Sequence, residues 1–267
     1  LNKIVLNLAL PSLIFMAMYT ADLSSIGSLV EITAVCITVG TLGGLLAYLF
    51  SRVRHYPEKT KWSVTVSAVL FNSGFLGYPV VLGVFGAEGL VRAIFYDAGS
   101  TILFICLGIL LLIIFGGERS SIVKRTLLFP PVWALLLGVS INLLHLNVGS
   151  MAPAVLKYLS GATVPLIMIS LGLSLEISSL KNYIEEAFAV SGIKLILAPL
   201  IALLMVTVLG INGLNSQVTI VEAAMPSAML GLVLAITYDL DVKAAGACTF
   251  LSTVISMVTL PIIMALV

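Results

Sequence analysis

The sequence predicts an all-α protein that crosses a membrane several times. Of its 267 residues, 60% are hydrophobic and only 9% are charged, whereas a soluble domain carries about a quarter charged residues. Apolar runs recur along the whole chain, and they lack the alternation of polar and apolar residues that marks a membrane-spanning barrel. Because lipid offers the backbone no hydrogen bonds, these runs are expected to be helices.

Nine apolar stretches are the expected spans, since a helix of about 20 mostly apolar residues crosses a bilayer. They cover residues 3–19, 28–50, 62–86, 89–115, 131–144, 152–175, 183–209, 216–238 and 242–267. Of the 13 Lys and Arg residues, only Arg92 and Lys157 fall on the side opposite the basic connection RVRHYPEKTK. The positive-inside rule therefore predicts a multi-pass protein of the cell (inner) membrane, whose chain begins in the cytoplasm and ends outside.

Three short matches in the same order indicate an internal repeat. The matched pairs are 9–26 with 163–180, Pro79 with Pro226, and Ser100 with Ser252. The first and sixth spans, which carry the first match, run in opposite directions through the bilayer. Inverted repeats of this kind are typical of secondary transporters.

The repeat divides the chain at a short connection. Residues 1–116 form the first inverted repeat, 117–130 a short cytoplasmic connection, and 131–267 the second inverted repeat. The fifth span has no counterpart in the first half, so the expected arrangement of five helices plus five lacks its first helix here. Either the protein has lost that helix or it precedes Leu1.

Two spans contain residues that interrupt a helix near mid-membrane. In the stretch FNSGFLGYPV, Pro79 lacks an N–H and disfavours a helical conformation at Tyr78, and Gly77 permits backbone angles closed to other residues. Pro226, followed by Ser227, is expected to interrupt the eighth span in the same way. Unpaired backbone groups are costly in lipid unless they line a polar cavity or pair with each other. We therefore expect the two interruptions to meet and to form a transport site.

Interrupted helices of this kind favour an anion. Second half-helices that begin at Pro79 and Pro226 would point free N–H groups and positive dipole ends into the site, which suits a carboxylate. The side chains of Asn72 and Ser73 add hydrogen bonds. The expected substrate-binding residues are Asn72, Ser73, Gly77, Tyr78, Pro79, Met225, Pro226 and Ser227.

Acidic residues within the spans are candidates for coupling transport to an ion. Glu222 lies four residues before Pro226, where a buried carboxylate can take up a proton or hold a cation. The alternative for Glu222 is an interfacial position. Asp97 is either a second ligand for the ion or a partner of Arg92. We expect Lys194 to extend to the cytoplasmic surface; the alternative is a pairing with a carboxylate.

At these positions the sequence resembles the auxin efflux carrier family, which includes plant PIN-type carriers and bacterial malate and malonate permease-like proteins. The resemblance covers nearly the whole chain and rests on LNKIVLNLALPSLIF, FNSGFLGYPVVLGVFG, GATVPLIMISLGLSL and EAAMPSAMLGLVLAITYDLD. It implies ten helices in two inverted five-helix repeats, as in bile-acid symporters and sodium/proton antiporters. It likens Glu222 to a sodium-binding glutamate of bile-acid symporters. The residues that it places on the two crossing segments are Asn72, Gly77 and Pro79 on one, and Met225, Pro226 and Ser227 on the other.

The sequence thus predicts a secondary carrier of a small organic anion, such as a carboxylate, with alternating access around the crossing. One alternative is a cation/proton antiporter that uses Glu222 and Asp97; a nontransporting partner or sensor subunit is another. An enzyme is disfavoured because the spans contain neither HExxH nor a Ser–His pair. The expected partners are the organic anion and the bilayer, with Na⁺ or H⁺ coupling and a homodimer left open. We expect no cofactor, bound metal or nucleic acid.

Overall fold

The computed structural model describes residues 1–24, 26–116, 129–173 and 180–267. In chain order its elements are α1 (Asn2–Ile4), η1 (Val5–Ala9), α2 (Leu10–Thr20), α3 (Ile26–Val53), α4 (Glu58–Val69), η2 (Ser73–Gly77), α5 (Tyr78–Phe115), α7 (Pro130–Leu143), α8 (Met151–Gly161), α9 (Thr163–Leu173), η3 (Leu180–Asn182), α10 (Ile184–Gly192), η4 (Ile193–Leu197), α11 (Ala198–Leu209), α12 (Leu214–Ala223), α13 (Leu230–Thr237) and α14 (Val242–Leu266). Gly86, with a φ of 65°, divides α5 into two helices. Helical segments therefore lie in each of the nine expected ranges.

Within these described residues, five helical stretches are long and apolar enough to cross a membrane. They are Ile26–Val53, Ser73–Phe115, Met151–Leu173, Ile184–Leu209 and Val242–Leu266. Two more, Val5–Thr20 and Pro130–Leu143, are apolar but shorter. Leucine, isoleucine and valine side chains cover much of the outer surface of these helices, where a bilayer would bury them. The chain is an all-helical, polytopic integral membrane protein, and the number of crossings stays a prediction.

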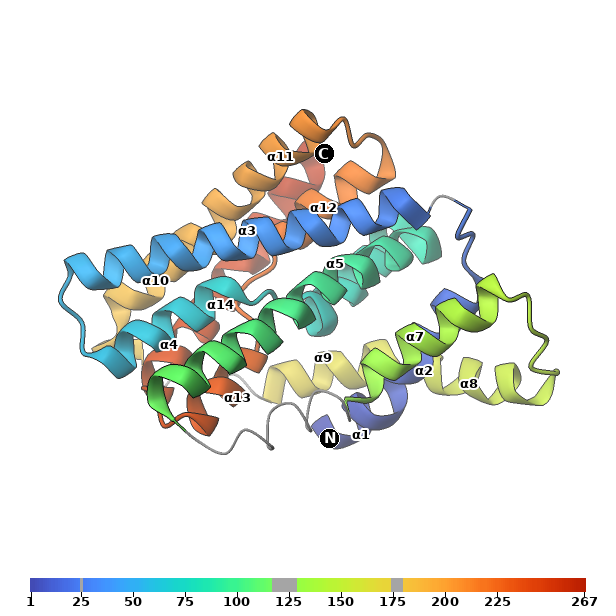
Figure 1. Cartoon of the computed structure of the whole chain (residues 1–267), viewed down its shortest axis with the longest axis horizontal. Helices are drawn as coiled ribbons and strands as arrows, with labels where there is room; N and C mark the ends of the chain where they lie inside the picture. Colours follow the sequence, from blue (N-terminus) through green and yellow to red (C-terminus); the bar gives the residue numbers. More distant parts are fainter. Residues whose placement is uncertain (25, 117–128, 174–179) are drawn as a thin grey trace.

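The helices form two groups that lie side by side (Figure 1). In the smaller group, α2 packs against α7 and α8. In the larger group, α3 packs against α4 and α5, and α14 packs against α10 and α4. The two groups touch where α2 meets α5 and where α9 meets the short turn η2. Elements from both halves of the sequence therefore build the larger group.

Three π turns each end two residues before a proline: η1 before Pro11, η2 before Pro79 and η4 before Pro199. In each, the residue just before the proline donates its N–H to a carbonyl five residues back instead of four. A proline ring in a regular α-helix clashes with the carbonyl four residues earlier, and the wider turn relieves that clash. A proline that follows such a turn bends the helix without interrupting it.

Candidate functional site

Two non-helical segments cross inside the larger group. The first begins after α4, where Leu70 has an extended backbone, and ends where η2 begins at Ser73. The second lies between α12 and α13. Phe71 and Ser227, at the centres of the two segments, form an isolated antiparallel bridge. We call residues 70–72 and 224–229 together the crossing.

Backbone hydrogen bonds join the two segments on both sides of that bridge. The N–H of Asn72 donates to the carbonyl of Pro226 at 2.9 Å, and the N–H of Ala228 donates to the carbonyl of Leu70 at 3.1 Å. Each segment thus satisfies backbone groups that the other would leave unpaired in the membrane interior. The interruption at Met225–Pro226 and the meeting of the two segments agree with the sequence prediction.

The position predicted for the first interruption is wrong. Tyr78 and Pro79 lie at the start of α5, in a helix that continues from η2, because the π turn accommodates the proline ring. Gly77 is also helical, with a φ of −63°. The helix after the first interruption therefore begins at Ser73, not at Pro79. The half-helix after the second interruption begins at Leu230, four residues beyond the predicted Pro226.

A serine from a following helix holds the centre of each segment. The N–H of Phe71 donates to Ser100 Oγ at 3.4 Å, and the N–H of Ser227 donates to Ser252 Oγ at 3.2 Å. The sequence match of Ser100 with Ser252 therefore joins residues with the same role at the crossing. The sequence match of Pro79 with Pro226 pairs residues with different roles. Pro226 lies next to the bridged residue Ser227, whereas Pro79 lies eight residues after the bridged residue Phe71.

Glu222 is fully buried in the last turn of α12, directly before the second segment of the crossing. Neither of its carboxylate oxygens has a hydrogen-bond partner within the described residues. The carboxylate lies against Gly77: a Cβ added there would be 2.5 Å from both oxygens. Gly77 is thus needed for the close approach of Glu222, and its backbone angles would suit other residues too.

Asp97 accepts hydrogen bonds from two hydroxyl groups, one in the turn η2 and one in the residue that follows it. Ser73 Oγ donates to one carboxylate oxygen, and Tyr78 OH donates to the other at 2.9 Å. The expected alternative, a pairing with Arg92, is wrong. Arg92 donates instead to Asn215 Oδ1 at 2.6 Å and to the carbonyl of Glu88 at 2.7 Å.

Lys194 brings a cation to the crossing, which sequence reasoning missed. Its side chain is fully buried, so the expected extension to the cytoplasmic surface is wrong. Its Nζ lies 3.1 Å from the centroid of the Phe71 ring, a cation–π contact, and the described part of the chain gives it no hydrogen bond. Only its place eleven residues inside a span hinted at burial.

Two cavities lie between the helices of the protein. One of about 580 Å³ lies where α2 ends and α12 begins, and Arg92 and Asn215 are among its lining residues. The other, of about 320 Å³, lies between α5 and α7 and reaches Tyr78 and Asp97. Neither of these two cavities is lined by Met225, Pro226 or Ser227, which are buried. Among the described residues, no cluster of three or more His, Cys, Asp or Glu side chains could hold a metal ion.

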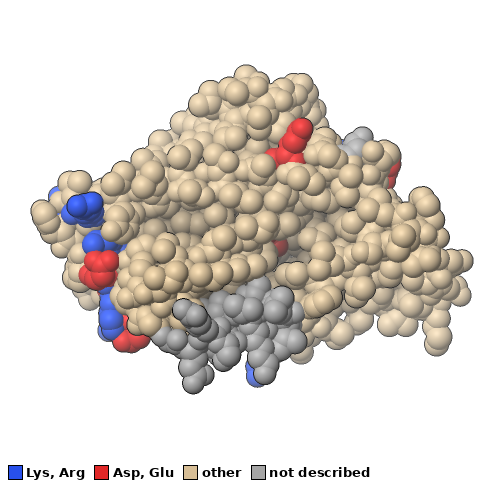
Figure 2. Space-filling model, in the orientation of Figure 1, with Lys and Arg blue, Asp and Glu red and all other residues tan. Residues whose placement is uncertain are grey.

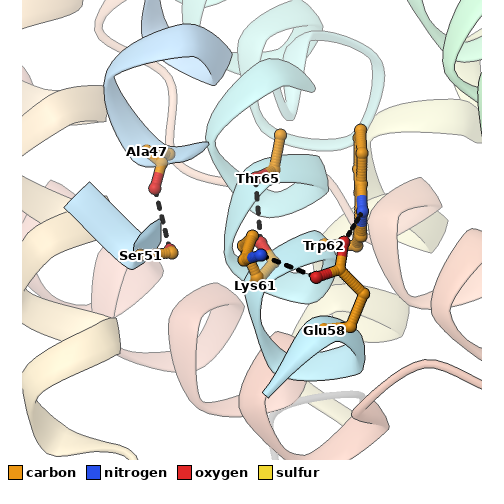
Figure 3. Close-up of polar contacts among 6 residues, drawn as sticks. All are labelled: Ala47, Ser51, Glu58, Lys61, Trp62 and Thr65. Atoms are coloured by element: carbon orange, nitrogen blue, oxygen red, sulfur yellow. Dashed lines mark hydrogen bonds and ion pairs between the residues drawn. The ribbon is translucent and has the colours of Figure 1, made fainter. Parts of the chain in front are cut away.

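Charged side chains gather at one end of the bundle, where α3 turns into α4 (Figure 2). Lys59 pairs there with Asp239 from the connection between α13 and α14. Glu58 accepts hydrogen bonds from Lys61 at 2.6 Å and from the Trp62 indole at 2.9 Å (Figure 3). The hydrogen bond from Lys59 holds the pKa of Asp239 below its usual range. This end matches the cytoplasmic side of the predicted orientation.

Known proteins resemble the chain along nearly all of its length. A family model described as membrane transport protein matches residues 1–119 and 117–264. A protein named an uncharacterized transporter from Methanothermobacter thermautotrophicus is 54% identical over 262 residues, which are 98% of this chain and 86% of the relative. The uncharacterized transporter MJ1031 from Methanocaldococcus jannaschii is 38% identical over 267 residues, 97% of this chain and 86% of the relative. The uncharacterized transporter YfdV from Escherichia coli is 25% identical over 273 residues, with 98% and 86% covered.

Replacing Gly77 by alanine should destabilise the fold, because the new methyl group would meet both carboxylate oxygens of Glu222. Overpacking of this kind costs about 1–3 kcal/mol, which thermal melting of the purified protein would detect. Gly74→Ala in the same turn is the matched control, since its Cβ would lie at an ordinary 3.8 Å from Asp97. Equal melting temperatures for the two variants would contradict the close packing, and Glu222→Ala should restore the stability of Gly77→Ala.

Asp239→Asn should lower the melting temperature at pH 7, and this effect should shrink as the pH falls through the native pKa of Asp239. The native pKa of Asp239 lies below its unfolded value, so the stability it contributes is present above the unfolded pKa of about 4 and is lost as pH falls through the native pKa. Asparagine suits the φ of 50° at this position. Lys59→Met should give the same loss at pH 7, and a difference that persists at pH 3 would assign the effect to packing.

Proposed function

The chain belongs to the membrane transport protein family, and on this premise we propose that it is a secondary carrier of a small organic anion such as a carboxylate. It is a transporter and not an enzyme. In the proposed mechanism, the larger helix group moves against α2, α7, α8 and α9, so that the crossing is reached alternately from each side of the membrane. The observation that carries this proposal is the crossing itself.

The crossing supports an anion through three kinds of donor. The helix that starts at Ser73 and the half-helix that starts at Leu230 both direct their positive ends toward it. The side-chain nitrogen of Asn72 is buried and has no hydrogen-bond partner in the described part of the chain. The ammonium of Lys194 lies beneath the Phe71 ring. An anion that reached this point would meet an amide donor and a cation.

The local symmetry of the crossing supports an inverted repeat. Phe71 and Ser227 face each other in an antiparallel bridge. Ser100 Oγ accepts a hydrogen bond from the N–H of Phe71, and Ser252 Oγ accepts one from the N–H of Ser227. A two-fold axis through the bridge would exchange these pairs. Such a relation would let the two halves exchange conformations when the carrier turns from one side to the other.

A cation/proton antiporter is the second candidate, and the two buried carboxylates favour it. Asp97 and Glu222 both lie against the turn η2, Asp97 near Gly74 and Glu222 near Gly77, and neither forms an ion pair within the described residues. Two negative charges at membrane depth are costly unless a proton or a cation joins them. In the carrier, the same pair would bind the coupling ion, Na⁺ or H⁺.

Binding of a monocarboxylic acid, its amide and the primary amine of the same skeleton tests the sign of the substrate. The acid should bind best, and Lys194→Met should weaken its binding roughly tenfold or more, about 1.4 kcal/mol, because a hydrogen bond to a charged group is lost. Lys157→Met removes an exposed lysine and is the control. Calorimetry on the protein in detergent would measure the binding of the acid, the amide and the amine. Strongest binding of the amine would favour the antiporter.

Glu222→Gln keeps the shape of the side chain and removes its charge. If Glu222 couples transport to a cation, the variant should lose accumulation driven by an ion gradient and keep exchange of substrate across the membrane of proteoliposomes. Unchanged ion-driven uptake would assign Glu222 a structural role against Gly77. A thermal melt of the variant separates loss of coupling from loss of fold.

A further inference from the structure

The geometry points to a second ligand site, which we propose takes an amphiphile with an apolar body and an ammonium end. The site is the 320 Å³ cavity between α5 and α7. Its volume lies at the lower end of the range for small-molecule sites. It is not the anion site of the crossing, because none of its lining residues belongs to residues 70–72 or 224–229.

The walls of the cavity are apolar and come from both helix groups. Ile14 from α2, Ile94 and Ile105 from α5, and Leu135 from α7 line it. An apolar body would gain about 25 cal/mol for each square ångström that it buries here. The site therefore selects first for a hydrophobic ligand.

The cavity opens toward the lipid. Three of its lining side chains are also exposed on the outer surface of the protein: Ile102 by 43%, Trp133 by 50% and Leu136 by 52%. They lie within helices expected to span the bilayer, where such apolar side chains face acyl chains. A ligand dissolved in the membrane would thus reach the cavity sideways, between α5 and α7.

One carboxylate gives the cavity its charge. Asp97 is the charged residue of the lining, and both of its oxygens accept hydrogen bonds from hydroxyl groups. The ion pairs of the described residues lie elsewhere, at the charged end of the bundle. Lys194, the buried lysine of the described residues, contacts the Phe71 ring. Among the residues that the structure describes, Asp97 therefore faces the cavity without a positive partner.

A ligand with an ammonium group would supply that partner. Burying an unpaired charge is costly, and a charge-assisted hydrogen bond from an ammonium to a carboxylate offsets the cost. An organic anion would instead be repelled by Asp97, because no lysine or arginine among the lining residues offsets that charge, whereas Lys194 lies at the crossing. A bare metal ion would need more oxygen ligands than these walls offer, since Tyr78 and Thr101 are the hydroxyl-bearing residues beside Asp97.

Trp133 lines the cavity, so its fluorescence reports occupation directly. The chain has two tryptophans, and the Trp62→Phe variant leaves Trp133 as the single reporter. We would reconstitute this variant in phosphatidylcholine nanodiscs and titrate it with 2-phenylethylammonium, 2-phenylethanol and 3-phenylpropanoate. The ammonium should bind at least tenfold more tightly than the alcohol, and the carboxylate should bind most weakly.

Two substitutions locate the site and its charge. Asp97→Asn should reduce the affinity of the ammonium to that of the alcohol. Ile105→Phe, two turns from Asp97, should fill the cavity and weaken binding of all three probes. Ile109→Phe is the matched control, because Ile109 lies one turn further along α5, is exposed to lipid and does not line the cavity.

Equal affinities for the three probes would overturn the proposal and identify a pocket for acyl chains. Loss of the ammonium's advantage in the presence of Na⁺ would assign Asp97 to a metal ion and overturn it as well. If Asp97→Asn does not fold, two other measurements still test the proposal. They are the ratio of ammonium to alcohol affinity in the Trp62→Phe protein, and the contrast of Ile105→Phe with Ile109→Phe. Because the readout is binding at Trp133 without transport, failure here does not bear on anion binding at the crossing, and failure of an anion to bind there does not bear on this cavity.

Discussion

The backbone bridge between Phe71 and Ser227 is the interaction on which the rest of the site depends. Two interrupted helices in a membrane leave N–H and C=O groups that lipid cannot pair. Here each interruption supplies partners for the other, at 2.9 Å and 3.1 Å on either side of the bridge. This requirement forces the two segments to lie together, and it fixes α4, η2, α12 and α13 around one point. The ionisable side chains of Asp97, Lys194 and Glu222 lie around that point.

Three ionisable side chains lie around the crossing in different electrostatic situations. Asp97 is satisfied by two hydroxyl groups, Lys194 rests on an aromatic ring, and Glu222 contacts the backbone of Gly77 without a hydrogen bond. A fold selected for stability alone would replace such groups by apolar residues of similar size. Ionisable residues inside a membrane are costly and usually mark a functional site. A binding function therefore explains best why these three side chains lie together.

The sequence predicts the helices and the second interruption, because apolar length and a proline among small polar residues are local signals. It also pairs Ser100 with Ser252, whose hydroxyl groups hold equivalent backbone positions. The site at Leu70–Asn72 carries no local signal, since the break there depends on partners supplied by residues 226–228. The place of Lys194 at the crossing carries no local signal for a similar reason, because its contact with Phe71 joins residues far apart in the sequence.

Pro79 acts on the site in a different way from the one that helix-breaking rules suggest. By favouring the π turn η2, it places residues five apart on nearly the same face of the helix, where a regular α-helix would separate them. Ser73 and Tyr78 have this spacing, and both donate to Asp97. The same turn directs Gly77 toward Glu222. One proline outside the crossing thus aligns the groups that contact both carboxylates, and it does so by reshaping the helix without ending it.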